Sequence, residues 1–99
     1  MKLSICGFVA GAVLVAAAGA AQAADGQAVY NSSCAACHNF MKPKIGDKDA
    51  WAPLIKQGTP AMVASVIKGK GAMPARGGKP SLSDDDITAA VEYMESKSQ

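Results

Sequence analysis

The residues best suited to chemistry stand in one short run, Cys34-Ala35-Ala36-Cys37-His38. Two thiols three residues apart, followed directly by an imidazole, form the attachment sequence for a c-type haem. Thiols one helical turn apart reach the two vinyl groups on one porphyrin edge, and His38 then lies under the iron as an axial ligand. His38 is the only histidine in the chain, so no other residue competes for that role. We therefore expect one covalently bound haem c.

Three other uses of the thiols remain open at this point. Cys34 and Cys37 could form a redox dithiol, but that motif expects a preceding strand, and none is predicted here. Together with His38 they could bind zinc, but a zinc site needs four ligands and these residues supply three. They could also form a simple disulfide. Export of the chain, argued below, favours haem attachment, because c-type assembly takes place outside the bacterial cytoplasm.

A sulfur ligand is expected on the other side of the iron. Met62 and Met94 lie on apolar faces of predicted helices, where methionine usually packs in a core. Met41 follows the histidine by three residues, so the chain would have to turn round the haem rim at once. Met73 stands 35 residues after His38, in a glycine-rich loop and directly before a proline. We predict Met73 as the ligand.

Four helices are expected to position these groups, and no convincing strand is predicted. They run from Asp25 to about Ala36, from about Asp49 to Gln57, from Thr59 to a stop at Gly69, and onward from Ser83. Asp25, Thr59 and Ser83 are the expected N-caps. Pro53 is tolerable in the second helix only near its first turn. Ile87, Ala90, Val91 and Met94 form the apolar stripe of the last helix.

The segment from 69 to 80 separates the third and fourth helices. It holds four glycines and two prolines in 12 residues, which is typical of a loop. A loop this long in so small a domain usually has a function. Its expected function is to present Met73.

The first residues indicate export. Lys2 is followed by 22 uncharged residues, Leu3 to Ala24, that include Ala21-Gln22-Ala23. This pattern is typical of a secretory signal peptide, and we predict cleavage after Ala23 and a periplasmic location. An uncleaved membrane anchor is the alternative. Residues 24–99 then form one domain of 76 residues, too small to rely on a hydrophobic core alone.

Composition excludes several classes of protein. At 99 residues and a net charge of +2, the chain is too short for a dinucleotide-binding fold and not basic enough for a typical nucleic-acid binder. We find no paired carboxylates, no nucleophile–base set and no phosphate loop. The sequence therefore predicts no enzyme active site.

Charge is unevenly distributed along the domain. Residues 42–79 hold eight basic and two acidic side chains, and residues 80–99 hold five acidic and one basic. Such a dipole orients a protein as it approaches a partner. We expect redox partner proteins, a membrane enzyme among them but without membrane insertion, to dock at a basic face near the haem edge that includes Lys68, Lys70 and Arg76. A solvated lysine-rich face with no partner is the alternative.

The sequence resembles the class I c-type cytochromes, and within them the small bacterial cytochrome c5 group. The resemblance covers nearly all of residues 24–99. It is carried by Ala28-Val29-Tyr30-Asn31, the Cys34–His38 run, Pro43-Lys44, Gly46-Asp47-Lys48, Ala50-Trp51-Ala52-Pro53, Lys68-Gly69-Lys70, Ala72-Met73-Pro74, Gly77-Gly78 and Leu82-Ser83-Asp84.

The resemblance implies an all-α fold of about four helices wrapped round one haem, with His38 and Met73 axial. It also implies that Gly26 and Tyr30 pack against Ala90 and Tyr93 where the first and last helices cross. Two features depart from the family. The second cysteine pair found in many members is absent, and the loop after the histidine is shorter.

Two further residues are expected at the haem. Metal-bound histidines nearly always donate to an acceptor, and the carbonyl of Pro43 is the best candidate for His38 Nδ1–H. Trp51 is the only tryptophan, and its indole N–H is expected near a haem propionate, since a buried indole usually finds an acceptor.

The function predicted from these residues is a periplasmic one-haem electron carrier. Ligation by histidine and methionine fills both axial positions and raises the reduction potential relative to two nitrogen ligands. The alternative is a five-coordinate haem sensor or peroxidase-like protein with a labile Met73. A third interpretation is an interaction module anchored by an uncleaved leader.

Overall fold

The computed structural model describes residues 24–99, so the predicted signal peptide and its cleavage site lie outside the described part of the chain. Within residues 24–99 the regular structure is helical, apart from one isolated bridge between Lys70 and Met73. The predicted all-α class is therefore confirmed. None of the described helices is long and apolar enough to cross a membrane.

The first helical stretch consists of α2 (Gly26–Val29), the π-helical turn η2 (Tyr30–Cys34) and α3 (Ala35–His38). Asp25 is the N-cap, as predicted, and its carboxylate accepts from the Ala28 N–H at 3.2 Å. The predicted helix from Asp25 to about Ala36 is confirmed, but its middle turn, η2, is π-helical. There the Ser32 hydroxyl donates to the Val29 carbonyl at 3.3 Å, and serine side chains that bond to nearby carbonyls disturb the regular helical ladder.

Helix α4 spans Lys48–Gln57, with Asp47 as its N-cap and Gly58 at its end. It thus begins one residue before the predicted start. Pro53 lies inside α4 and not in its first turn, contrary to expectation. Pro53 is exposed, so water can bind the helical carbonyl that its missing N–H leaves free.

Helix α5 spans Thr59–Lys68 and ends at Gly69, as predicted. Its N-cap is Gly58, with a φ of 99°, and the assignment of Thr59 as N-cap was wrong. The Thr59 hydroxyl instead donates to the Glu95 carboxylate, at 3.0 and 3.2 Å from its two oxygens. This bond joins the start of α5 to the end of the last helix, a contact that no local pattern in the sequence indicates.

Helix α6 spans Asp84–Lys97 and begins with a capping box, in which Ser83 and Asp86 each accept from the other's backbone N–H at 3.0 Å. Three acidic residues in its first turn complement the positive end of the helix dipole. The predicted apolar stripe is confirmed, because its four members are buried: Ile87, Ala90, Val91 and Met94. Together with Tyr30, Trp51 and Met62 they make up the core.

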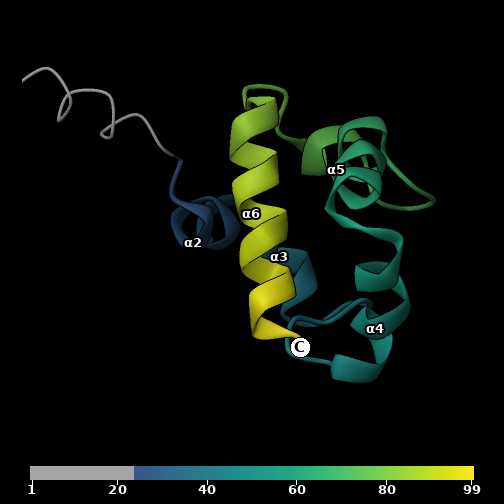
Figure 1. Cartoon of the computed structure of the whole chain (residues 1–99). Helices are drawn as coiled ribbons and strands as arrows, with labels where there is room; N and C mark the ends of the chain where they lie inside the picture. Colours follow the sequence, from purple (N-terminus) through teal and green to yellow (C-terminus); the bar gives the residue numbers. More distant parts are fainter. Residues whose placement is uncertain (1–23) are drawn as a thin grey trace, which may run out of the picture.

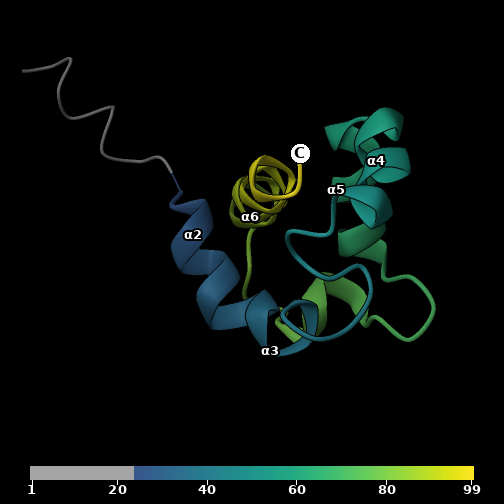
Figure 2. The same ribbon diagram turned by 90° about the horizontal axis from the view of Figure 1, so that it is seen from below.

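Helix α6 lies in the middle of the domain, with α2 on one side and α4 and α5 on the other (Figures 1 and 2). The crossing of α2 and α6 is close. A Cβ on Gly26 would lie 2.8 Å from the carbonyl carbon of Ala89 and 3.1 Å from the Cβ of Tyr93, which confirms the predicted packing of Gly26 against Tyr93 and adds Ala89 to the contact. Beside it, as predicted, Tyr30 packs on Tyr93, with ring centroids 5.5 Å apart.

The loop between α5 and α6 is more ordered than its composition indicates. Lys70 and Met73 exchange two backbone hydrogen bonds of 3.0 Å, and a short 3-10 turn, η3 (Ala75–Gly78), follows. Gly69 has a φ of 88°, and a Cβ there would lie 2.9 Å from the Ala75 nitrogen. Glycine is required at this position, because both its φ and its contacts exclude a side chain.

Candidate functional site

The helices and the loops between them line a partly open cavity of about 460 Å³. Its volume is within the range of cofactor-binding pockets. Both cysteines of the motif, His38, Met73, Pro43 and Trp51 all line it. Much of the remaining wall is apolar and comes from α4, α5 and α6: Leu54, Met62, Val66, Ile87, Ala90, Val91 and Met94. The structure therefore brings all six predicted site residues to one cavity. Sequence reasoning did not assign these apolar residues to the site, although their helical period places them on inward faces.

The two thiols are free and both reach the cavity, Cys34 half-buried and Cys37 exposed. Burial raises the pKa of the Cys34 thiol, repulsion from Cys37 raises it further, and Lys79 opposes the change. A redox-active dithiol needs a thiol with a lowered pKa, so this environment does not favour that alternative. Among residues 24–99 no three His, Cys, Asp or Glu side chains are grouped so as to hold a metal ion.

The imidazole of His38 is oriented by the loop that follows it. His38 Nδ1 lies 2.9 Å from the carbonyl oxygen of Pro43, which confirms the predicted contact. A carbonyl only accepts hydrogen bonds, so Nδ1 carries the proton and donates it. Nε2 is then the nitrogen with a free lone pair, as a metal ligand requires. The Ile45 N–H also donates to the His38 carbonyl at 2.8 Å, which closes the loop.

Trp51 is buried at 4% exposure and lines the cavity, but the expected role of its N–H was wrong. The indole Nε1–H donates to the Lys44 carbonyl at 2.9 Å and is thus already paired within the protein. The carbonyls of two consecutive residues, Pro43 and Lys44, are therefore held by His38 and Trp51. Trp51 fixes the segment that orients the imidazole.

We expect Trp51→Phe to loosen this segment while filling most of the same space. The Lys44 carbonyl keeps the Asp47 N–H at 3.1 Å but loses the indole donor, and the loss of one such hydrogen bond costs about 0.5–1.5 kcal/mol of unfolding free energy. Denaturant titration measures that loss, and NMR should show faster solvent exchange of the His38 Nδ1 proton. Trp51→Leu is the control, since it removes the ring as well as the donor and should destabilise more. Unchanged exchange of the Nδ1 proton in Trp51→Phe would contradict a positioning role.

All four methionines of the described chain line the cavity, so lining alone does not select the sulfur ligand. Met62 and Met94 are buried at 7% and 4% exposure, which confirms their place in the core. The Met41 N–H donates to the Cys37 carbonyl at 2.7 Å, so Met41 is tied to the attachment motif itself. Met73 differs from all three, because it stands on a loop braced by its bonds to Lys70.

The charges near the cavity differ from the predicted distribution in two places. Arg76 donates to the Leu82 carbonyl at 2.8 Å and forms an ion pair with Asp84, also at 2.8 Å. Its charge is partly neutralised, so Arg76 contributes less to the predicted basic face than Lys68 and Lys70. Glu95, counted in the acidic segment, is 8% exposed and paired with Thr59. Lys68 and Lys70 remain exposed.

The chain is similar to known proteins over most of its length. Residues 21–94 match the family described as "Cytochrome C oxidase, cbb3-type, subunit III". The chain is 50% identical over 84 residues to cytochrome c-555 of Chlorobaculum thiosulfatiphilum, covering 78% of this chain and 98% of that protein. It is 40% identical over 84 residues to cytochrome c6 of Leptolyngbya boryana, covering 80% and 96%.

A solved structure is also similar. It is described as an electron transfer complex of nitrite reductase with cytochrome c, and the matched chain has 45% sequence identity and a TM-score of 0.72. The match covers 75% of this chain and 94% of that one.

Proposed function

This chain belongs to the small class I c-type cytochromes and binds one covalently attached haem c, and from that premise we propose that it carries single electrons between redox proteins. Cys34 and Cys37 are the proposed attachment points, and His38 and Met73 the proposed axial ligands. The observation that carries the proposal is the bond from His38 Nδ1 to Pro43, which leaves Nε2 for the iron in a cavity that Met73 also lines.

When bound, the haem supplies a one-electron couple. The protein's role is to keep the surroundings of the haem iron the same in both oxidation states. His38 is held by Pro43 and Ile45, and the Met73 loop is braced by its paired bonds with Lys70. The apolar walls from α4, α5 and α6 exclude water. With two protein ligands in place no position is left for a substrate, which supports a carrier and not an enzyme.

Carbon monoxide distinguishes this proposal from a five-coordinate sensor or peroxidase-like protein. The ferrous holoprotein at neutral pH is expected to show no spectral change with carbon monoxide, because Met73 occupies the position that the gas would take. A ready shift of the Soret band in the wild-type protein would contradict the carrier proposal.

We further propose that the carrier works in the periplasm after cleavage at Ala23. The support is the uncharged run from Leu3 to Ala24, which ends beside the Ala21-Gln22-Ala23 box. The narrower likeness to the cytochrome c5 group stays a prediction, since the relatives named above are called c-555 and c6.

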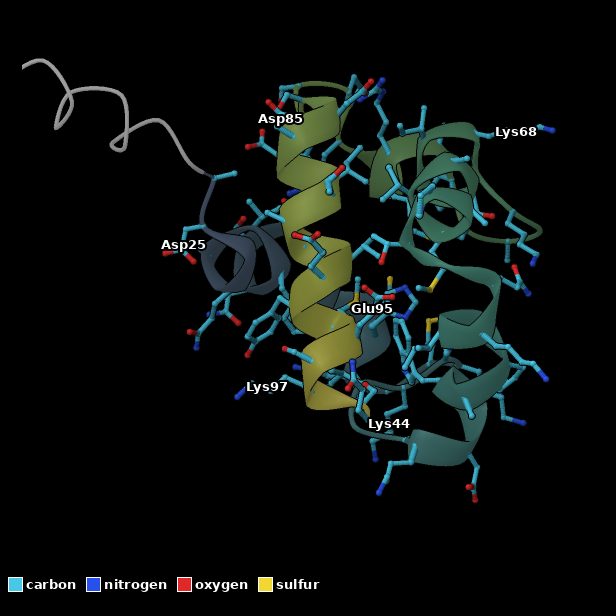
Figure 3. All side chains as sticks on the ribbon, in the orientation of Figure 1. Asp25, Lys44, Lys68, Asp85, Glu95 and Lys97 are labelled. Carbon is cyan, nitrogen blue, oxygen red and sulfur yellow. The ribbon has the colours of Figure 1, made fainter. Side chains whose placement is uncertain are left out.

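The proposed partners are redox enzymes, including membrane-bound ones. A nitrite reductase is one candidate, because the similar cytochrome c was solved in complex with such an enzyme. We propose that Lys68 and Lys70 steer the approach. Both are exposed, Lys70 lines the cavity, and Lys68 extends outward from the end of α5 (Figure 3).

Steering by these lysines predicts a salt-sensitive rate. Electron transfer from the reduced protein to nitrite reductase should slow by about tenfold as ionic strength rises from about 0.01 to 0.3 M, because salt screens exposed charges. Lys68→Glu/Lys70→Glu should flatten this dependence. The matched control is Lys48→Glu/Lys56→Glu on α4, which makes the same change in net charge and should keep the wild-type profile. Equal profiles in both double variants would contradict steering by this pair.

A further inference from the structure

Arg76 has a backbone conformation that is unusual for a residue with a side chain. Its φ is 56°, and among residues 24–99 it is the only residue other than glycine with a positive φ. Gly77 and Gly78 continue the same left-handed run at 62° and 80°. A Cβ disfavours this region, so the backbone at Arg76 is strained. Strained residues persist where the surrounding structure holds them in place, and they are frequent at ligand clamps and switch segments.

The side chain of Arg76 holds this strained position through two bonds. One guanidinium nitrogen donates to the Leu82 carbonyl at 2.8 Å, and the other donates to the Asp84 carboxylate at 2.8 Å. The Arg76 side chain is 29% exposed, so solvent screens its bonds only in part. Leu82 and Asp84 flank Ser83, the N-cap of α6. The guanidinium therefore fixes the loop between α5 and α6 to the start of α6.

Met73 stands three residues before Arg76 in the same loop. On one side Met73 is held by its paired bonds with Lys70. On the other side the Pro74 carbonyl accepts from the Gly77 N–H at 3.1 Å, so Met73 and Arg76 belong to one hydrogen-bonded turn. Arg76 and Met73 also line the same cavity. Movement of Met73 out of the cavity together with this turn would therefore break the guanidinium bonds.

We propose that Arg76 is a positioning residue, whose bonds to Leu82 and Asp84 hold the Met73 loop against the cavity and so keep the thioether at the iron. The inference rests on the proposed axial role of Met73 and goes beyond it, because it names the side chain that sets how often this ligand leaves. Opening of one loop has its own free energy, smaller than that of global unfolding. Without the guanidinium bonds, the backbone at residue 76 can relax to a negative φ and carry Met73 away.

The test measures loop opening in the ferric holoprotein with uncharged imidazole as the probe. Imidazole binds the iron only after the thioether has left, so its binding rate at saturating concentration equals the rate of loop opening. In Arg76→Ala this rate should rise about tenfold, the factor expected for the loss of a charge-assisted hydrogen bond. Lys56→Ala on α4 removes one exposed positive charge elsewhere and should open at the wild-type rate. An unchanged rate in Arg76→Ala would overturn the proposal.

Asp84→Asn is the second variant, since it breaks the ion pair and leaves Arg76 in place. It should open about threefold faster than the wild type at low salt, as expected for a partly exposed pair, and the difference should shrink at high salt. Asp85→Asn makes the same charge change one residue further along α6 and is the matched control. Equal opening rates in Asp84→Asn and Asp85→Asn at low salt would also overturn the proposal.

Heating separates a positioning role from a merely structural one. The near-infrared charge-transfer band of a ferric iron–thioether bond reports the ligand, and the helical circular dichroism signal reports the fold. In Arg76→Ala the band should disappear further below the unfolding temperature than it does in the wild type. If both temperatures fell by the same amount, Arg76 would have a structural role only. Absence of the band from the wild-type protein would instead contradict the axial role of Met73, so the two failures are distinguishable.

Discussion

Met73→Ala is expected to leave the haem attached while opening the iron to carbon monoxide and lowering the reduction potential. Attachment depends on the proposed thioether bonds to Cys34 and Cys37, which this change does not touch. The potential depends on the axial sulfur, because thioether ligation favours the ferrous state. Axial ligands as a group set haem potentials over a range of about 0.8 V, so a fall on the order of 100 mV is expected.

Carbon monoxide difference spectra and potentiometric titration measure the two effects. Because Met41, Met62 and Met94 line the same cavity, Met41→Ala is the matched control. It removes a thioether from the cavity wall without reaching the proposed axial position, and its spectrum should stay that of the wild type. If Met41→Ala opened the iron and Met73→Ala did not, the ligand assignment would have to move to Met41.

Gly26→Ala is expected to destabilise the folded protein strongly, although alanine is the better helix former. By propensity alone, alanine in place of glycine inside a helix would stabilise by about 1 kcal/mol. Here the added Cβ meets the backbone of Ala89 and lies 3.1 Å from the Tyr93 Cβ. A backbone atom cannot move aside as a flexible side chain can, so α2 and α6 must separate. Overpacking of this kind costs about 1–3 kcal/mol, which outweighs the gain in propensity.

Guanidinium titration of the holoprotein measures this difference in unfolding free energy. Gln27→Ala is the control, because Gln27 is the next residue of α2 and is exposed. That variant should match or slightly exceed the wild type in stability. A stability gain in Gly26→Ala would show that the two helices tolerate greater separation and would contradict the close crossing.

Helix ends and the attachment motif could be predicted from the sequence because their physics is local. An N-cap such as Asp25 or Ser83 bonds to a backbone N–H three residues away. The Cys34–His38 run likewise concerns neighbours on one helical turn. The Pro43 carbonyl lies five residues from His38, close enough for the loop between them to decide the contact. For such features the amino-acid sequence already determines which atoms can come into contact.

Contacts between distant segments were decided by the tertiary structure alone. Thr59 fits an N-cap pattern, yet its hydroxyl bonds to Glu95, 36 residues away. Arg76 counts as a free positive charge until the fold places Asp84 beside it. Each of these polar groups takes the strongest partner that packing brings near it, and an ionised partner outweighs a weak local one.

For the cavity, too, some features follow from the sequence and others depend on the fold. The sequence by itself determined that two thiols and an imidazole lie together and that a glycine-rich loop carries Met73. Only the fold decided that Met41, Met62 and Met94 also line the cavity, that the Trp51 indole holds the Lys44 carbonyl, and that Phe40 remains in solvent. The physical reason is that burial depends on how α4, α5 and α6 pack against one another, and no window of neighbouring residues contains that information.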